Sequence, residues 1–123
     1  MTDITTTVDT HLEAYGETDP ARRAGLIAQV WLPDGELIDP PLEGKGHDGI
    51  GEMATAVLEH FPGHTFRRTT AIDEHHGFVR YGWELIGGDG TVAIAGVDVA
   101  QLEDGRLRRV TGFFGELPPP KED

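Results

Sequence analysis

The sequence predicts an α+β fold in which three N-terminal helices pack on a strongly curved, mostly antiparallel β-sheet. Up to residue 61, apolar residues recur at the three- and four-residue spacing of helices. From His64 onward they alternate with a period of two, which is typical of strands. Helices followed by a run of strands favour an α+β domain over a parallel α/β sheet.

Two helices are predicted in the first third of the chain. Residues 5–16 place three apolar side chains on one helical face: Val8, Leu12 and Tyr15. Asp19-Pro20 then supplies a capping carboxylate and a proline at the first helical position. We expect this second helix to include Trp31 and to end before Pro33, because proline breaks a helix.

A short strand and a third helix are expected next. Residues 35–39 are predicted as the strand, and Pro40-Pro41 is expected to prevent further pairing, because proline has no amide hydrogen. The third helix is predicted after Gly46, with His47 and Asp48 as capping residues. Pro62-Gly63 is expected to end it.

The remainder of the chain is predicted as a meander of strands over residues 66–73, 78–86, 91–102 and 106–115. Asp104-Gly105 is a strong hairpin signal, because these residue types accept positive φ angles. Alternation directs four side chains of the second of these strands inward: Val79, Tyr81, Trp83 and Leu85. Residues 117–123 are expected to be a disordered polar tail, so the domain is predicted as residues 1–116.

Composition restricts the partners and the compartment. A chain of 123 residues forms one domain, and its formal charge of −12 argues against nucleic acid and anionic membranes as partners. Cysteine is absent, which excludes disulfides and thiolate chemistry. The first seven residues have neither a basic region nor an apolar stretch, so we expect no signal peptide and a cytoplasmic protein.

The strand predicted over residues 91–102 is apolar on both faces. The helices are expected to cover one face, which leaves a stripe of small apolar side chains outside: Ala93, Ala95, Val97 and Val99. A second copy of the chain is the simplest cover for that stripe, so a homodimer is predicted.

Two aspartates occupy positions where strands are expected to be apolar. Asp39 ends the short strand beside Pro40, and Asp98 lies between Val97 and Val99. A carboxylate in such a place must be exposed, paired or protonated, because burial of an unpaired charge is costly. We expect Asp98 to have the higher pKa and Asp39 to ionise more easily. The plain alternative is that Asp39 only starts a turn, since Asp-Pro is an ordinary turn sequence.

The order of elements and two local segments resemble the cone-shaped NTF2-like superfamily, and within it the SnoaL-type polyketide cyclases and ketosteroid isomerase. One segment is residues 31–40, an aromatic helix end, an acidic turn and a strand that ends in Asp-Pro. The other runs from Val97-Asp98-Val99 through Asp104-Gly105 to Thr111-Gly112-Phe113-Phe114. The resemblance covers nearly the whole chain.

The resemblance implies cofactor-free proton transfer next to a carbonyl of a hydrophobic ring compound. Asp39 matches the base of the isomerase, and Asp98 matches its neutral hydrogen-bond donor. His11 stands where the isomerase has its tyrosine donor, with Tyr15 one turn later and Tyr81 on the sheet as other candidates. The arginine that limonene-type epoxide hydrolases carry two residues before the strand aspartate is replaced by Gly96, so that chemistry is not expected.

We therefore expect Asp39, Asp98 and His11 as catalytic residues in one apolar cavity. Five side chains are expected to form its walls: Tyr15, Leu37, Tyr81, Trp83 and Phe114. No metal is expected, because the adjacent His75 and His76 point to opposite faces and no third ligand is placed by the sequence. The rival hypothesis is a non-catalytic module of the same fold that binds an apolar small molecule or a protein partner.

Overall fold

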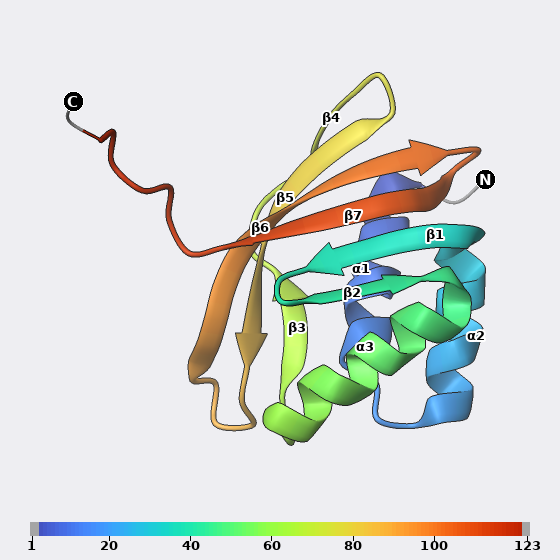
Figure 1. Cartoon of the computed structure of the whole chain (residues 1–123), viewed down its shortest axis with the longest axis horizontal. Helices are drawn as coiled ribbons and strands as arrows, with labels where there is room; N and C mark the ends of the chain where they lie inside the picture. The colour runs from blue at the N-terminus through green and yellow to red at the C-terminus, as the bar shows by residue number, and fades with distance from the viewer. Residues whose placement is uncertain (1–2, 122–123) are drawn as a thin grey trace.

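The computed structural model describes residues 3–121 and confirms the predicted fold class. The expectation that the chain has no signal peptide depends partly on residues 1–2, and the predicted disordered tail includes residues 122–123. Both pairs of residues lie outside the part of the chain that the structure describes. Three helices lie against a seven-stranded sheet (Figure 1). They are α1 (Ile4–Tyr15), α2 (Pro20–Val30) and α3 (Gly46–His60). Within residues 3–121, no helix is long and apolar enough to cross a membrane.

The sheet has the strand order β2-β1-β7-β6-β5-β3, and β4 also pairs with β5. The strands are β1 (Trp31–Asp39), β2 (Leu42–Lys45), β3 (Thr65–Arg68), β4 (Asp73–His75), β5 (Phe78–Ile86), β6 (Val92–Glu103) and β7 (Arg106–Phe114). All described pairs are antiparallel except β1 with β7. The long strands β5 and β6 bend along their length (Figure 1).

The predicted extent of the second helix was wrong at its C-terminal end. Helix α2 ends at Val30, and Trp31 is already the first residue of β1, with its side chain fully buried. Pro33 lies within β1, where the register with β7 shifts between Trp31 and Glu36. Proline is tolerated there because an irregular strand segment needs no ladder hydrogen bond at every residue.

Pro40-Pro41 does not end the pairing of the chain as expected. The two prolines form the turn itself, and β2 returns alongside β1 with Asp39 opposite Leu42. Neither proline needs an amide hydrogen in that turn, so the physical objection to pairing does not apply. This hairpin sets Asp39 at the last position of β1 before the turn.

The third helix begins without the predicted capping by His47 and Asp48. Its N-cap residue is Lys45, and no side chain caps the helix; Asp48 lies in the first turn. The imidazole Nε2 of His47 instead contacts the main-chain oxygen of Trp31 at 3.0 Å. This contact ties the start of α3 to β1.

The strand predicted over residues 66–73 is in fact two short strands, β3 and β4. Between them, Gly82 of β5 donates its amide hydrogen to Oγ1 of Thr70 at 2.8 Å, and the Thr69 amide donates to the Gly82 carbonyl. A threonine hydroxyl thus replaces a main-chain partner and interrupts the ladder.

Three other expectations about the strands are confirmed. Asp104 and Gly105 have φ angles of 53° and 77°, as a tight hairpin turn requires. The inward-facing set of β5 is buried: Val79, Tyr81, Trp83 and Leu85. The outer stripe of β6 is exposed, with Val97 and Val99 each about two-fifths accessible, at 41% and 40%.

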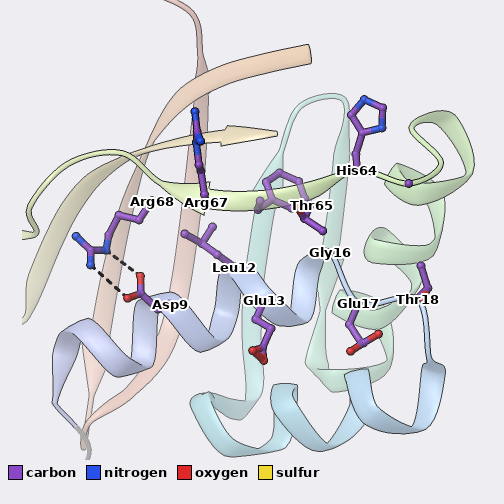
Figure 2. A pocket seen from close by; sticks show the side chains of 12 residues that line it. Asp9, Leu12, Glu13, Gly16, Glu17, Thr18, His64, Thr65, Arg67 and Arg68 are labelled. Atoms are coloured by element: carbon purple, nitrogen blue, oxygen red, sulfur yellow. Dashed lines mark hydrogen bonds and ion pairs between the residues drawn. The ribbon is translucent and has the colours of Figure 1, made fainter. Parts of the chain in front are cut away.

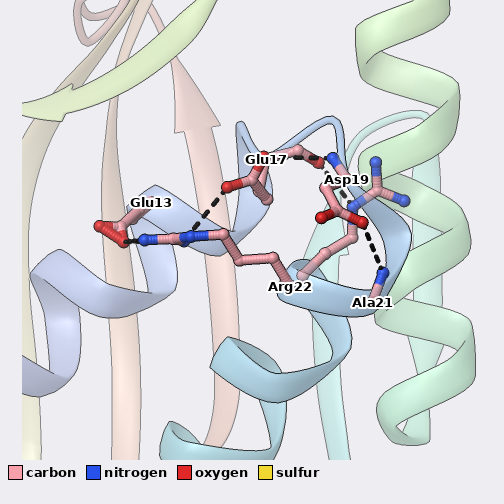
Figure 3. Close-up of polar contacts among 6 residues, drawn as sticks. Glu13, Glu17, Asp19, Ala21 and Arg22 are labelled. Carbon is pink, nitrogen blue, oxygen red and sulfur yellow. Dashed lines mark hydrogen bonds and ion pairs between the residues drawn. The ribbon is translucent and has the colours of Figure 1, made fainter.

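Ion pairs hold the connection between α1 and α2 (Figure 3). The Arg22 guanidinium contacts Glu13 at 3.2 Å and Glu17 at 3.1 Å, and Glu17 also accepts from the Asp19 amide. Asp19 caps α2 as predicted, since its side chain accepts from the Ala21 amide. These contacts are mostly exposed, so they contribute little individually to stability.

Candidate active site

An apolar pocket of about 200 Å³ opens between α3, the β1–β2 turn and the sheet. Its outer part is lined mainly by apolar side chains: Pro40, Pro41, Leu42, Val57, Phe61, Phe66, Trp83, Leu85, Ile94 and Phe114. Asp39 is the acidic group in this lining. Asp39, Phe66 and Trp83 also line an adjoining small cavity of about 10 Å³, called the inner extension below, whose other lining residues are His11, Leu12, Tyr15, Leu37 and Asp98. The pocket is therefore a concave apolar site with a few convergent polar groups at its inner end.

Asp39 is buried, with 8% of its surface exposed. The Tyr15 phenol donates a hydrogen bond of 3.0 Å to its Oδ2. Its other oxygen, Oδ1, is buried without a hydrogen-bond partner among residues 3–121. Burial raises the pKa of Asp39 above its usual range, and the hydrogen bond from Tyr15 opposes part of that rise.

Asp98 belongs to β6, and its side chain lies on the side of the sheet that faces α1. Only 6% of its surface is exposed. The Tyr81 phenol donates a hydrogen bond of 2.8 Å to its Oδ2. Burial raises the pKa of Asp98 to about 7; the Tyr81 hydrogen bond opposes the rise and the nearby Asp39 charge adds to it. The exposed fractions of the two aspartates are nearly equal, at 8% for Asp39 and 6% for Asp98. Asp98 is nevertheless enclosed by more protein, which explains its stronger desolvation.

Strand pairing brings the two carboxyls together over a glycine. Asp98 is opposite Gly112 in the β6–β7 pair, and Tyr81 is opposite Asp98 in the β5–β6 pair. On the other side of β7, Asp39 follows the paired residues Ile38 and Thr111. A Cβ atom on Gly112 would lie 3.2 Å from Oδ1 of Asp98 and closer still to Oδ1 of Asp39. The missing side chain at Gly112 is what lets both carboxyl oxygens occupy this space.

His11 is a fully buried, neutral imidazole. The Trp31 indole donates a hydrogen bond of 3.3 Å to its Nδ1. Because indole nitrogen is only a donor, Nδ1 must be the acceptor, and the single ring proton of His11 lies on Nε2. Burial lowers the pKa of His11 to about 4, so the imidazole stays neutral at ordinary pH. His11 lines the inner extension and stacks on Tyr15.

The predicted wall residues divide into three groups. Tyr15 and Leu37 line the inner extension, and Phe114 lines the outer pocket. Trp83 lines both parts. Tyr81 lines neither part; it lies behind Asp98 and holds that carboxyl in place.

Several pocket residues were not anticipated from the sequence. Val57 reaches the pocket from the last turn of α3, Phe61 from the C-cap position of that helix, and Phe66 from β3. Their spacing in the sequence, with Ile50 and Met53, predicts only that Val57 and Phe61 share one buried face of the third helix. The available signal is a further aromatic residue, Phe66, at the start of the strand that follows the helix, but sequence alone does not separate a core contact from a pocket wall.

Larger hollows elsewhere on the molecule are open surface grooves. The groove between α1 and β3 has a volume of about 620 Å³ and is bordered by charged side chains (Figure 2). Arg68 forms an ion pair of 2.8 Å with Asp9 across it, and Arg67 pairs with Glu84. Neither Asp39 nor Asp98 lines this groove. The smaller apolar pocket is therefore the better candidate for an active site, although the groove is larger.

The described residues contain no group of three or more His, Cys, Asp or Glu placed to hold one metal ion. His75 and His76 are exposed at the β4–β5 turn, and their Nδ1 atoms are 3.2 Å apart. The polar groups at the pocket's inner end are carboxyls, phenols, an imidazole and an indole. Such a set can transfer a proton and donate hydrogen bonds to an oxygen.

Comparison with protein families and curated proteins gave one match. A family model described as the SnoaL-like domain matches residues 8–110. Among the curated proteins, nothing matches this chain.

Solved structures with the same fold include three from bacteria. A candidate isomerase of the SnoaL-like family from Agrobacterium tumefaciens str. C58 is 37% identical, covers 94% of this chain and 100% of its own, and has a TM-score of 0.85. A candidate SnoaL-like polyketide cyclase from Jannaschia sp. CCS1 is 17% identical over 89% of this chain and 85% of its own, with a TM-score of 0.67.

A protein with a ketosteroid isomerase-like fold from Catenulispora acidiphila DSM 44928, solved with trimethylamine, is 12% identical over 87% of this chain and 83% of its own. Its TM-score is 0.71. At such low identity, this structure and the one from Jannaschia show a common fold and nothing further.

Proposed function

The chain belongs to the SnoaL-like domain family, as its sequence resemblance predicted, and on that premise we propose that it is a cofactor-free enzyme of the ketosteroid isomerase and SnoaL type. Its reaction is the transfer of a proton next to a carbonyl of a hydrophobic ring compound. The observation that carries this proposal is the approach of two buried carboxyls, Asp39 and Asp98, over Gly112 at the end of an apolar pocket.

Asp39 is the proposed base. Its Oδ1 has no hydrogen-bond partner within residues 3–121, while Oδ2 is held by Tyr15, so one oxygen of known orientation is available to a substrate C–H group. The raised pKa makes this carboxylate a stronger base than an exposed aspartate, and bases matched to the working pH are the more effective ones.

Asp98 is the proposed hydrogen-bond donor. When Asp39 takes the proton from carbon, the C–H electron pair moves into the ring system and negative charge develops on the carbonyl oxygen. A protonated Asp98 donates to that oxygen, and the Nε2–H group of His11 supplies a second neutral donor. Return of the proton from Asp39 to a different carbon completes an isomerisation.

The test is deuterium exchange at the carbon next to the carbonyl of a two-ring ketone such as 2-tetralone, together with isomerisation of a 3-oxo-Δ5-steroid. We expect Asp39→Asn to lower exchange at least about 100-fold, as loss of a general base does, because an amide cannot accept the proton. Asp98→Asn should cost less, because the amide still donates a hydrogen bond. The matched control is Asp34→Asn, an exposed carboxylate on the same strand, which should leave exchange unchanged.

The rival function is a non-catalytic binding module for an apolar small molecule or protein partner. It is favoured by the Tyr15 hydrogen bond, which makes Asp39 a weaker base than burial alone would. Tight binding of 2-tetralone to the wild-type protein without measurable exchange would select this function over the enzyme.

We also propose that the protein is a homodimer that buries the outer stripe of β6. Val97 and Val99 are exposed there, beside Phe113 of β7, which is 58% accessible. Light scattering should give about twice the 13.4 kDa chain mass. Val97→Glu should shift the protein toward a monomer, whereas Ala28→Glu on the exposed side of α2 should not.

A further inference from the structure

Only two buried side-chain polar atoms of residues 3–121 lack a hydrogen-bond partner: Oδ1 of Asp39 and Nε1 of Trp83. Folded proteins contain few such atoms, because each costs about 1–3 kcal/mol of desolvation when it is left unpaired. One of the two is an acceptor and the other is a donor. Both residues line the outer pocket and its inner extension.

The Trp83 indole is fixed in this position from several sides. Trp83 of β5 is opposite Gly96 of β6, and a Cβ on Gly96 would lie 2.6 Å from Cζ2 and 3.0 Å from Cε2 of the indole. Cε2 is the carbon bonded to Nε1. Phe66 and Phe114 pack edge-to-face against the ring, with centroids 5.7 Å away in both pairs. The N–H direction is therefore set before any ligand enters, which is how donors in active sites avoid reorganisation.

The indole N–H lies on the same side of the cavity as Asp98. The indole N–H acts on Asp98 as a weak hydrogen-bond donor that lowers the pKa of this carboxyl, although the contact does not reach ordinary hydrogen-bond geometry. Asp39 approaches from the opposite side of Gly112. A ligand oxygen at the inner end of the pocket would thus have donors on one side and the free Asp39 oxygen on the other.

We propose that Trp83 is a further catalytic residue, whose indole N–H donates a hydrogen bond to the substrate oxygen beside Asp98. The inference rests on the proposed function for the proton transfer to Asp39, and it narrows the substrate class. Oδ1 of Asp39 needs a donor and Nε1 of Trp83 needs an acceptor. A ligand that fits both is a ring compound in which an oxygen acceptor stands next to an acidic O–H or C–H group. Phenols, enols and enolisable ring ketones have that combination, and plain hydrocarbons do not.

The binding half of the proposal is testable without turnover, with 2-naphthol and naphthalene as probes. The protein has two indole N–H resonances, from Trp31 and Trp83. On addition of 2-naphthol, the ¹H resonance of Trp83 should move downfield, because its N–H gains an acceptor. The Trp31 resonance should stay in place, since that N–H is already donated to His11. Naphthalene has no oxygen acceptor, so its addition should not produce this downfield shift of the Trp83 N–H resonance.

Substitution provides the second measurement. Trp83→Phe should weaken 2-naphthol binding about tenfold, the effect of one hydrogen bond to a buried group, and leave naphthalene binding within about twofold. In the exchange assay, the same variant should lower kcat more than it raises KM, because the hydrogen bond strengthens as charge develops on the oxygen.

The results that would overturn the inference are distinct from those that would overturn the proposed function. Failure of 2-naphthol to bind, an equal Trp83 response to naphthalene, or a Trp83 resonance that follows only the titration of Asp98 would each remove Trp83 as a ligand donor. If the Trp83 response is present but ketone exchange does not depend on Asp39, the proton-transfer function fails and Trp83 remains a binding residue.

Discussion

The Tyr15 phenol donates its hydrogen bond to Oδ2 of Asp39, so the two oxygens of one buried carboxyl have different surroundings. One is anchored to α1 and the other is free at the end of the pocket. The tyrosine that sequence resemblance offered as a substitute oxyanion donor is thus engaged with the proposed base in the ligand-free protein. That leaves Asp98, His11 and Trp83 as the donors available to a ligand oxygen.

The pH dependence of the proposed reaction should be bell-shaped. Activity requires Asp39 ionised and Asp98 protonated, so kcat/KM should fall at low pH and again above about pH 7, where Asp98 loses its proton. Asp98→Asn should abolish the alkaline limb, because an amide does not titrate in that range. A profile whose alkaline limb survives in Asp98→Asn would contradict the assignment.

Tyr15→Phe and Tyr81→Phe should move opposite limbs of that profile. Each removes a hydrogen bond that lowers a carboxyl pKa, that of Asp39 in the first variant and that of Asp98 in the second. Loss of a hydrogen bond to a charged group should raise the affected limb by about one pH unit. Tyr15→Phe should therefore shift the acid limb upward, and Tyr81→Phe the alkaline limb. The two variants serve as controls for one another, and a shift of the same limb in both would refute the separate roles.

Asp98 should make the protein less stable as pH rises. Its native pKa of about 7 exceeds the ordinary value of 3.8. Between those values the native state holds a proton that the unfolded state has released, so stability falls with increasing pH and levels off above the native pKa. Measured by urea unfolding, the free energy of unfolding of wild type minus that of Asp98→Asn should decrease by a few kcal/mol from about pH 4 to pH 8. A flat difference for Asp98→Asn across that window would be inconsistent with a buried, protonated carboxyl.

Gly112→Ala and Gly25→Ala form a matched pair with opposite expected outcomes. The added methyl group at Gly112 would occupy the space held by the Asp39 and Asp98 oxygens, so it should separate the carboxyls and reduce ketone exchange at least about tenfold. Gly25 lies on the exposed side of α2 with no atom within 4 Å of an added Cβ. There alanine should stabilise the protein by up to about 1 kcal/mol through helix propensity, without an effect on exchange. Thermal unfolding and the exchange assay together decide the pair.

His11 should occur as a single neutral tautomer with its proton on Nε2. Nitrogen NMR should find no titration of this imidazole above about pH 5, because burial lowers its pKa to about 4. Trp31→Phe removes the N–H that Nδ1 accepts, so the variant should show a mixture of tautomers and slower exchange at unchanged KM. If the ring proton of wild-type His11 were on Nδ1, that nitrogen could not accept the hydrogen bond from Trp31. The assignment of Trp31 as a positioning residue would then be wrong.

Local patterns predicted most elements of the fold but missed contacts that depend on distant partners. The helices follow from apolar spacing, and the Asp104-Gly105 turn follows from its residue types. The β2 strand was missed because prolines were read as a stop to pairing, although they occupy a turn. The break after Arg68 was missed because it depends on Thr70 meeting Gly82 of another strand.

The sequence by itself determined that Asp98 would be a buried acid and that Asp39 would end a strand, since both conclusions need only alternation and neighbouring residue types. The family resemblance implies that they share a cavity, but only the tertiary structure shows the contacts that bring the two carboxyls together. Parallel pairing of β1 with β7, segments about seventy positions apart, sets Asp39 beside Gly112, and the absent side chain there admits both carboxyl oxygens. The same long-range packing leaves Oδ1 of Asp39 and Nε1 of Trp83 without hydrogen-bond partners in the described part of the chain. No local sequence pattern predicts these unpaired atoms, because they result from the packing of strands that lie far apart in the sequence.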